Sequence, residues 1–203
     1  MSAVPAARRR ALMLINPNAR RGSEALDAVV ARLAEGGVDA VLERFDSSFE
    51  VSADIARRRH EADLVIICGG DGTLNSAAKG IVETGLPMGI IPMGTANDLA
   101  RTLGIPTKLL AAADVITSGN LKLIDLGEVN GHPFFNVASM GLSVDLARDL
   151  TPQAKRRWGK LGYALAAIRV ALHAKRFSAE IISNGEREQV KTLQIAVGNG
   201  VHY

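Results

Sequence analysis

The feature that most constrains the fold is an alternation of short apolar runs with amphipathic stretches through the first 119 residues. Apolar runs at 10–16, 38–45, 63–70 and 87–94 are predicted to be strands. Several of them are apolar at consecutive positions, which is typical of strands covered on both faces. We therefore predict an α/β fold with a parallel sheet between two layers of helices. The predicted helices span 24–37, 51–62, 73–84, 96–104 and 106–119.

The pattern changes after residue 118. The segments 120–141 and 177–199 read as antiparallel strands around the pairs Asn130–Gly131 and Asn184–Gly185, which tolerate the positive φ angles of a tight hairpin. A helix is predicted between them, over 158–175. We therefore predict two domains: an α/β domain at 1–118 and a β-rich domain at 119–203, which we expect to be incomplete because its last strand, 192–199, lies so close to Tyr203.

Composition excludes several classes of protein. The chain has 203 residues, of which 47% are hydrophobic, and no apolar run reaches the roughly 18 residues of a membrane-spanning helix. One cysteine, Cys68, excludes an internal disulfide, and the four histidines show no metal-ligand spacing. Aromatic residues make up only 4%, so the basic clusters lack the stacking residues of single-strand nucleic-acid binders. We expect a cytoplasmic protein with no nucleic-acid partner, whose basic clusters are solvated helix faces or contacts to phosphate or to an anionic membrane.

The glycines Gly69, Gly70 and Gly72 follow the most apolar run and precede a predicted helix. Glycine lets the chain turn sharply and leaves its amide groups open, while a helix N-terminus offers unpaired N–H groups and a partial positive charge. This is the pattern of a phosphate-binding loop. The loop is neither a P-loop nor a G-x-G-x-x-G turn. We expect a valine at position 70 to abolish nucleotide binding and leave the chain folded.

Asp71 is the carboxylate inside this loop. Because phosphate would repel it, Asp71 must turn away, bind a cation, or orient or deprotonate a hydroxyl; the structural alternative is a turn-forming aspartate bonded to its own loop amides. Thr73 is expected to cap the helix or donate to a phosphate oxygen, and Asn75 lies in the first turn.

Two further polar loops follow the first and the fourth apolar runs. Ligands of parallel sheets bind at the carboxyl ends of the strands, so three such loops at three strand ends predict one binding site. The candidate residues of these two loops are Asn16, Pro17, Asn18, Thr95, Asn97 and Asp98.

The motifs "NPNARRG", "GGDGTLN", "PMGTANDLARTLGIP" and "FFNVASMG" resemble, in this order, those of the diacylglycerol kinase catalytic-domain family, the bacterial lipid kinases related to sphingosine and ceramide kinases. The resemblance covers essentially the whole chain. "GGDGT" alone is shared with NAD kinases and 6-phosphofructokinases, whereas "GTANDLAR" favours the lipid kinases.

The resemblance implies an ATP-dependent kinase that requires Mg²⁺ and phosphorylates a lipid hydroxyl, such as that of diacylglycerol, presented at a membrane surface. It implies that Asp71 and Asp98 are the catalytic residues within this chain, and it leaves the metal ligands unknown. It places the nucleotide at Asn16, Pro17, Asn18, Gly69, Gly70, Asp71, Gly72, Thr73, Leu74, Asn75, Thr95 and Asn97.

The resemblance also bears on the activity, location and assembly of the chain. The family's catalytic glutamate and magnesium-linked acidic segment would fall beyond Tyr203, so the chain alone is expected to be nearly inactive. A location at the inner membrane face and a homodimer are both compatible with the sequence. The alternatives to a lipid kinase are an NAD kinase-like enzyme and a noncatalytic nucleotide-binding fragment. We also expect the basic-ended stretch 155–176 to lie near the membrane, against the alternative of an ordinary core helix.

Overall fold

The computed structural model describes residues 8–16, 23–45, 50–141 and 174–200. Contacts divide the chain into two compact units. One comprises residues 1–136 and 198–203, and the other comprises 137–197. The predicted domain boundary between 118 and 119 stays a prediction, and the predicted helix at 158–175 lies almost entirely outside the described residues.

The first unit is built on a parallel sheet, as predicted. Its strands are β1 (Arg9–Ile15), β2 (Val38–Arg44), β3 (Leu64–Gly69) and β4 (Met88–Pro92), and they lie in the order β2-β1-β3-β4. The two central strands carry the apolar runs: every residue of β3 is buried. At the edge, β2 exposes about half of Val41 and Leu42, because it has a neighbour on one side only.

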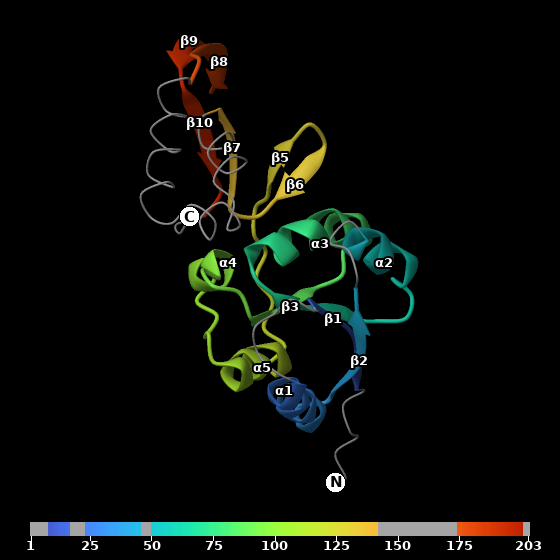
Figure 1. The fold of residues 1–203 in the computed structure, drawn as a ribbon. Helices are drawn as coiled ribbons and strands as arrows, with labels where there is room; N and C mark the ends of the chain where they lie inside the picture. The colour runs from blue at the N-terminus through green and yellow to red at the C-terminus, as the bar shows by residue number, and fades with distance from the viewer. Residues whose placement is uncertain (1–7, 17–22, 46–49, 142–173, 201–203) are drawn as a thin grey trace, which may run out of the picture. The chain divides into compact units, whose positions relative to one another are not determined.

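Helices cover both faces of this sheet (Figure 1). Helices α1 (Ser23–Glu35) and α5 (Leu109–Thr117) lie on one face, and α2 (Val51–Arg57) and α3 (Asp71–Thr84) lie on the other. The short helix α4 (Asp98–Thr102) follows β4, and its buried residues join the same core as those of α2 and α3. The α/β class predicted from the sequence is therefore confirmed.

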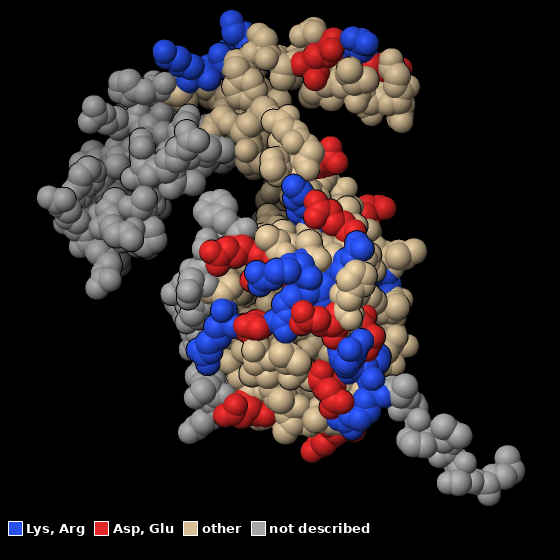
Figure 2. Space-filling model, turned by 90° about the vertical axis from the view of Figure 1, so that its right-hand side faces the viewer, with Lys and Arg blue, Asp and Glu red and all other residues tan. Residues whose placement is uncertain are grey.

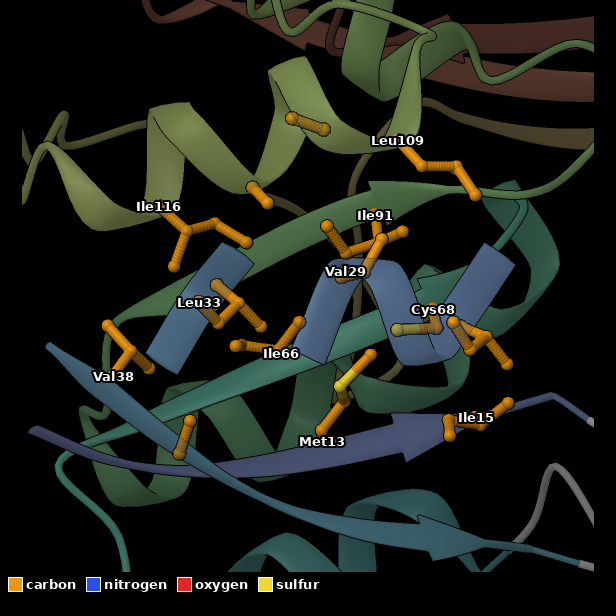
Figure 3. Close-up of a cluster of buried hydrophobic side chains, with 14 of the residues drawn as sticks. Met13, Ile15, Val29, Leu33, Val38, Ile66, Cys68, Ile91, Leu109 and Ile116 are labelled. Atoms are coloured by element: carbon orange, nitrogen blue, oxygen red, sulfur yellow. The ribbon is translucent and has the colours of Figure 1, made fainter. Parts of the chain in front are cut away.

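Each face of the sheet has its own core. Figure 3 shows the first, in which Met13 and Ile66 of the sheet pack against Val29 and Leu33 of α1 and Ile116 of α5. The neighbouring positions along the strands point to the opposite face, where Leu14 and Ile67 meet α2, α3 and α4. The consecutive apolar residues of β1 and β3 thus supply both cores.

The side chain of Ser52, in α2, connects this helix to the backbone of α3. The Ser52 hydroxyl donates to the carbonyl oxygen of Ser76 at 2.6 Å and accepts from the N–H of Gly80 at 3.0 Å. A Cβ at position 80 would lie 2.6 Å from the carbonyl oxygen of Ser52, so glycine is what allows the helices to come this close. The close packing fixes the direction of α3, whose first residues form part of the candidate site.

Antiparallel strands appear later in the chain, as predicted. Strands β5 (Gly127–Val129) and β6 (His132–Phe134) form a hairpin in the first unit, and β8 (Phe177–Ser183) pairs with β9 (Glu186–Thr192) in the second. Both turns have an Asn-Gly pair with positive φ at each residue, at Asn130 and Gly131 and at Asn184 and Gly185. The second unit also pairs β7 (Val137–Gly141) with β10 (Gln194–Gly198).

Several predicted elements have different limits. The helix predicted at 51–62 ends at Arg57, and the helix predicted from Thr73 begins two residues earlier, at Asp71. The predicted strand after residue 120 is shorter: residues 120–126 form no strand, and Leu121 and Leu123 are exposed. Among the described residues, no strand pairs with this stretch, so its alternating apolar pattern lacks the ladder that would make it a strand.

Candidate functional site

The loop between β3 and α3 is formed as an open helix N-terminus. Gly70 precedes the helix with an extended backbone, and its carbonyl oxygen accepts from the N–H groups of Thr73 and Leu74 at 2.9 and 3.0 Å. In the described part of the chain, the N–H groups of Asp71 and Gly72 have no hydrogen-bond partner. Gly72 is exposed, and a Cβ there would meet nothing within 4 Å. This helix end therefore offers two backbone N–H donors to an anion, and the space for that anion lies around Gly72.

Gly70 and Gly94 allow two loops to come into contact, because neither residue has a side chain. A Cβ on Gly94 would lie 2.5 Å from the Cα of Gly70, and a Cβ on Gly70 would lie 2.9 Å from the Cα of Gly94. The loops that follow β3 and β4 are thus in backbone contact, as expected for neighbouring strand ends. This contact explains why residue 70 is glycine, whereas the open space for a ligand lies beside Gly72. A valine at position 70 would therefore press on the backbone at Gly94 as well as on a ligand, so the expected loss of binding in a folded chain stays a prediction.

Asn97 shapes the loop after β4. Its backbone is left-handed, with φ 54° and ψ 46°, a conformation that asparagine tolerates better than most residues. Its Oδ1 accepts from the N–H of Gly94 at 2.9 Å, and its Nδ2 donates to the carbonyl oxygen of Gly94 at 3.0 Å. Its side chain is buried and closes the loop, which leaves Gly94, Thr95 and Ala96 exposed.

Asn16 connects the first polar loop to α3. Directly after β1, its N–H donates to the carbonyl oxygen of Cys68 at 3.1 Å, and its Nδ2 donates to Thr73 Oγ1 at 2.8 Å. Thr73 is buried and belongs to the first turn of α3. It is therefore not the N-cap of this helix, which was one of the two roles predicted for it. The loops after β1, β3 and β4 are therefore linked, in agreement with a single site at the carboxyl ends of these strands.

Asp71 does not bond to its own loop amides. Its Oδ1 accepts from the N–H of Leu99 at 3.0 Å and from Nδ2 of Asn136 at 2.8 Å. Within the described residues, Oδ2 has no hydrogen-bond partner. Asp98 lies one loop away and forms an ion pair with Arg101, whose Nη1 lies 3.6 Å from Asp98 Oδ1. Asp71 thus has one oxygen fixed by the protein and one available to a ligand or a cation.

The remaining predicted residues differ in what they present. Leu74 is buried in the core, so only its backbone belongs to the loop, and Gly69 is buried at the end of β3. The Oδ1 of Asn75 accepts from the N–H of Phe135 at 3.0 Å. Pro17 and Asn18 lie outside the described residues.

Asn136 is not among the site residues predicted from the sequence. It lies 65 residues from Asp71, and only its place inside the motif "FFNVASMG" could have drawn attention to it. Gly94 was predicted as the last residue of the apolar run at 87–94, and its contact with Gly70 depends on the register of β3 and β4, in which Gly69 lies opposite Pro92.

Many charged side chains on the described surface are paired with charges of opposite sign. The face drawn in Figure 2 carries blue and red side chains side by side. Arg58 pairs with Glu43 and Glu61, and Arg57 pairs with Asp54, so much of the basic cluster at 56–60 is neutralised locally. No group of three or more potential metal-ligating side chains occurs among the described residues, and none of the helices described there could span a membrane.

Cys68 is the residue two positions before Gly70. Burial raises the pKa of its thiol well above the usual range, so the thiol stays protonated. The side chain packs in the core shown in Figure 3, as expected for a structural cysteine.

The chain is similar to known diacylglycerol kinases in sequence and in fold. The family described as diacylglycerol kinase catalytic domain matches residues 10–129. The diacylglycerol kinase of Bacillus subtilis (strain 168) is 32% identical over 197 residues, which cover 93% of this chain and 64% of the relative. The solved structure of a diacylglycerol kinase from Bacillus anthracis str. Sterne is 30% identical, with a TM-score of 0.73 over 95% of this chain and 64% of that one. Another structure from that organism reaches a TM-score of 0.79 at 29% identity, over 100% of this chain and 68% of that one.

Proposed function

The chain belongs to the diacylglycerol kinase catalytic-domain family, and on this premise we propose that it binds ATP and serves the transfer of the γ-phosphoryl group to a lipid hydroxyl. The chain spans 64% of the length of its Bacillus subtilis relative, so the activity of the whole protein is part of the proposal. The acceptor class is taken from the printed names of the relatives, which are diacylglycerol kinases.

One observation carries the nucleotide part of the proposal. The N–H groups of Asp71 and Gly72 are without partners in the described chain, at the start of a 14-residue helix and beside an exposed glycine. Backbone donors at a helix N-terminus suit a phosphate group, because both the N–H groups and the helix dipole favour negative charge. The exposed loop at 94–96, held against Gly70, extends the same polar surface.

Asp71 fits the Mg²⁺ that the family implies. Mg²⁺ is commonly held by one or two carboxylates together with phosphate oxygens and waters, and it needs no cage of protein ligands. The Oδ2 of Asp71, next to the two amide donors, can supply such a carboxylate oxygen. The bound cation would neutralise charge on the transferring phosphoryl group.

In the proposed reaction, the lipid hydroxyl oxygen forms a bond to the γ-phosphorus while the bond from that phosphorus to the bridging oxygen of ADP breaks. The hydroxyl proton passes to a base. Asp71 and Asp98 are the carboxylates that these loops contribute, and we propose both as acidic residues of the active site. Their neighbours differ, since Asp71 is held by two N–H donors and Asp98 is paired with Arg101.

The nucleotide site is tested with Gly72→Val. Because a Cβ there meets nothing within 4 Å, the side chain enters the space assigned to phosphate without disturbing the loops. We expect the melting temperature to stay close to that of the wild type and the affinity for Mg·ATP, measured by calorimetry, to fall by about tenfold or more. The matched control is Lys79→Val, an exposed position of the same helix, which should bind ATP like the wild type. Equal ATP affinity in Gly72→Val and wild type would refute the site.

The acceptor is tested by phosphoryl transfer from radiolabelled ATP, with the complete protein rather than the 203-residue chain, since we expect this chain alone to be nearly inactive. Diacylglycerol, sphingoid and monoacylglycerol acceptors in mixed micelles are compared with NAD in parallel reactions. Label in a lipid product supports the proposal. Label in NADP alone would assign the chain to NAD kinase chemistry instead, and ATP binding without transfer to any acceptor would make it a nucleotide-binding unit.

A further inference from the structure

The residues Phe135 and Asn136, directly after β6, are held from several directions. The N–H of Phe135 donates to Asn75 Oδ1 at 3.0 Å, and its carbonyl oxygen accepts from Asn199 Nδ2 at 3.0 Å. The carbonyl oxygen of Asn136 accepts from the N–H of Asn199 at 2.6 Å. The backbone of Phe135 is therefore tied to α3, and the backbones of Phe135 and Asn136 are both tied to Asn199, more than 60 positions later in the chain.

The side chain of Asn136 is aimed at the carboxylate of Asp71. It is 8% exposed, and its Nδ2 donates to Asp71 Oδ1 at 2.8 Å. The N–H of Leu99 donates to the same oxygen at 3.0 Å. Two donors from separate segments on one oxygen fix the rotation of the carboxylate, and they leave Oδ2 as its available oxygen.

Packing alone does not explain why residue 136 is an asparagine. Its own Oδ1 is buried and has no partner in the described part of the chain. A buried amide oxygen without a hydrogen bond destabilises the folded state, so an apolar side chain of similar size would suit the position better if packing were its only role. The side-chain amide of Asn136 contributes instead the hydrogen bond that its Nδ2 donates to Asp71.

We propose that Asn136 is a positioning residue, which orients the Asp71 carboxylate so that Oδ2 faces the metal-bound phosphate of the nucleotide. This rests on the proposed function for the ligand, and on the hydrogen bonds above for the orientation. Asn199 supports the arrangement by holding the backbone of Asn136. The segment "FFNVASMG" is thereby connected to the loop at 69–75, although the two lie far apart in the sequence.

The proposal predicts a specific pattern in the variant Asn136→Leu, tested in the 203-residue chain. We expect affinity for Mg·ATP to fall by about tenfold, as for loss of a hydrogen bond to a charged group, while affinity for ATP without metal changes less than twofold. The Leu99 amide and the Asp71 carboxyl carbon should also shift in NMR spectra. If Asn136 had only a structural role, the affinity for Mg·ATP and the affinity for ATP without metal would fall alike. The control is Thr102→Val, which replaces another buried polar atom without a described partner and should alter neither affinity nor these two resonances.

A second variant keeps the test decisive if Asn136→Leu does not fold. Asp71→Asn combined with Asn136→Asp restores an N–H···O bond of reversed polarity, so it should recover the fold while Mg·ATP affinity stays low. Full recovery of that affinity, or unchanged Mg·ATP affinity in a folded Asn136→Leu, would overturn the proposal. If the wild type binds no ATP, the proposed function fails; the Asp71 carboxyl resonance in Asn136→Leu then decides separately whether Asn136 orients the carboxylate.

Discussion

Two glycines of the candidate site should respond in opposite ways to one added methyl group. In Gly94→Ala, the new Cβ would lie 2.5 Å from the Cα of Gly70 and 2.9 Å from Asn97 Oδ1. Carbon atoms pack at about 3.5–4.0 Å, so the loops must move apart by about 1 Å. Overpacking of this kind costs about 1–3 kcal/mol, which lowers the melting temperature of a chain of this size by about 2–12 °C.

Gly72→Ala should have the reverse effect. A Cβ at this position meets nothing within 4 Å, and the residue lies in the first turn of α3. Alanine favours helix and restricts the unfolded chain, so we expect a gain of about 0.5 kcal/mol and a melting temperature about 1–2 °C higher. Thermal unfolding followed by circular dichroism measures both variants against the wild type. A Gly94→Ala midpoint equal to or above that of the wild type would refute the packed contact between the loops, and a clearly lowered Gly72→Ala midpoint would contradict the open space at Gly72.

Three further outcomes are expected. Asn97→Ala loses two hydrogen bonds to Gly94 and a tolerated left-handed backbone, so urea unfolding should show a loss of about 1–3 kcal/mol; Asn97→Gly, which keeps the backbone freedom, should lose less. The buried thiol of Cys68 should not react with Ellman's reagent in the native protein at mildly alkaline pH and should react fully in urea; rapid native reaction would contradict its burial. The hydrogen bond from Arg8 lowers the pKa of Asp39, so this pair stabilises the fold above the unfolded pKa of about 3.9, and the benefit is lost as pH falls through the folded pKa. The small difference in urea midpoint between wild type and Asp39→Asn should therefore vanish in acid, and a difference that grows there would contradict it.

Local features of the fold could be predicted from the sequence. The consecutive apolar residues of β3 indicated a strand buried on both faces, and the two Asn-Gly pairs indicated hairpins, because each signal depends on neighbouring residues alone. The end of α2 was misjudged by several residues. Helical periodicity continues past Arg57, while the backbone there turns away at Arg58.

The site could be predicted in part. Glycines after an apolar run pointed to a loop at a helix N-terminus, and the structure places such a loop there. The reasons for individual residues depend on distant partners: Gly70 is opposed by Gly94, and Asp71 is bonded to Leu99 and Asn136. Such pairs depend on how strands and loops meet in three dimensions, which no spacing in a single sequence records.

The central claim is that nucleotide phosphate binds at the start of α3. It is tested most directly by titrating the ¹⁵N-labelled chain with Mg·ATP and following the backbone amide resonances. We predict that the largest shifts occur at Asp71 and Gly72, with smaller ones in the loop at 94–96, and that Gly72→Val removes them. Saturable shifts that leave Asp71 and Gly72 unchanged, or no shifts at millimolar nucleotide, would contradict the claim.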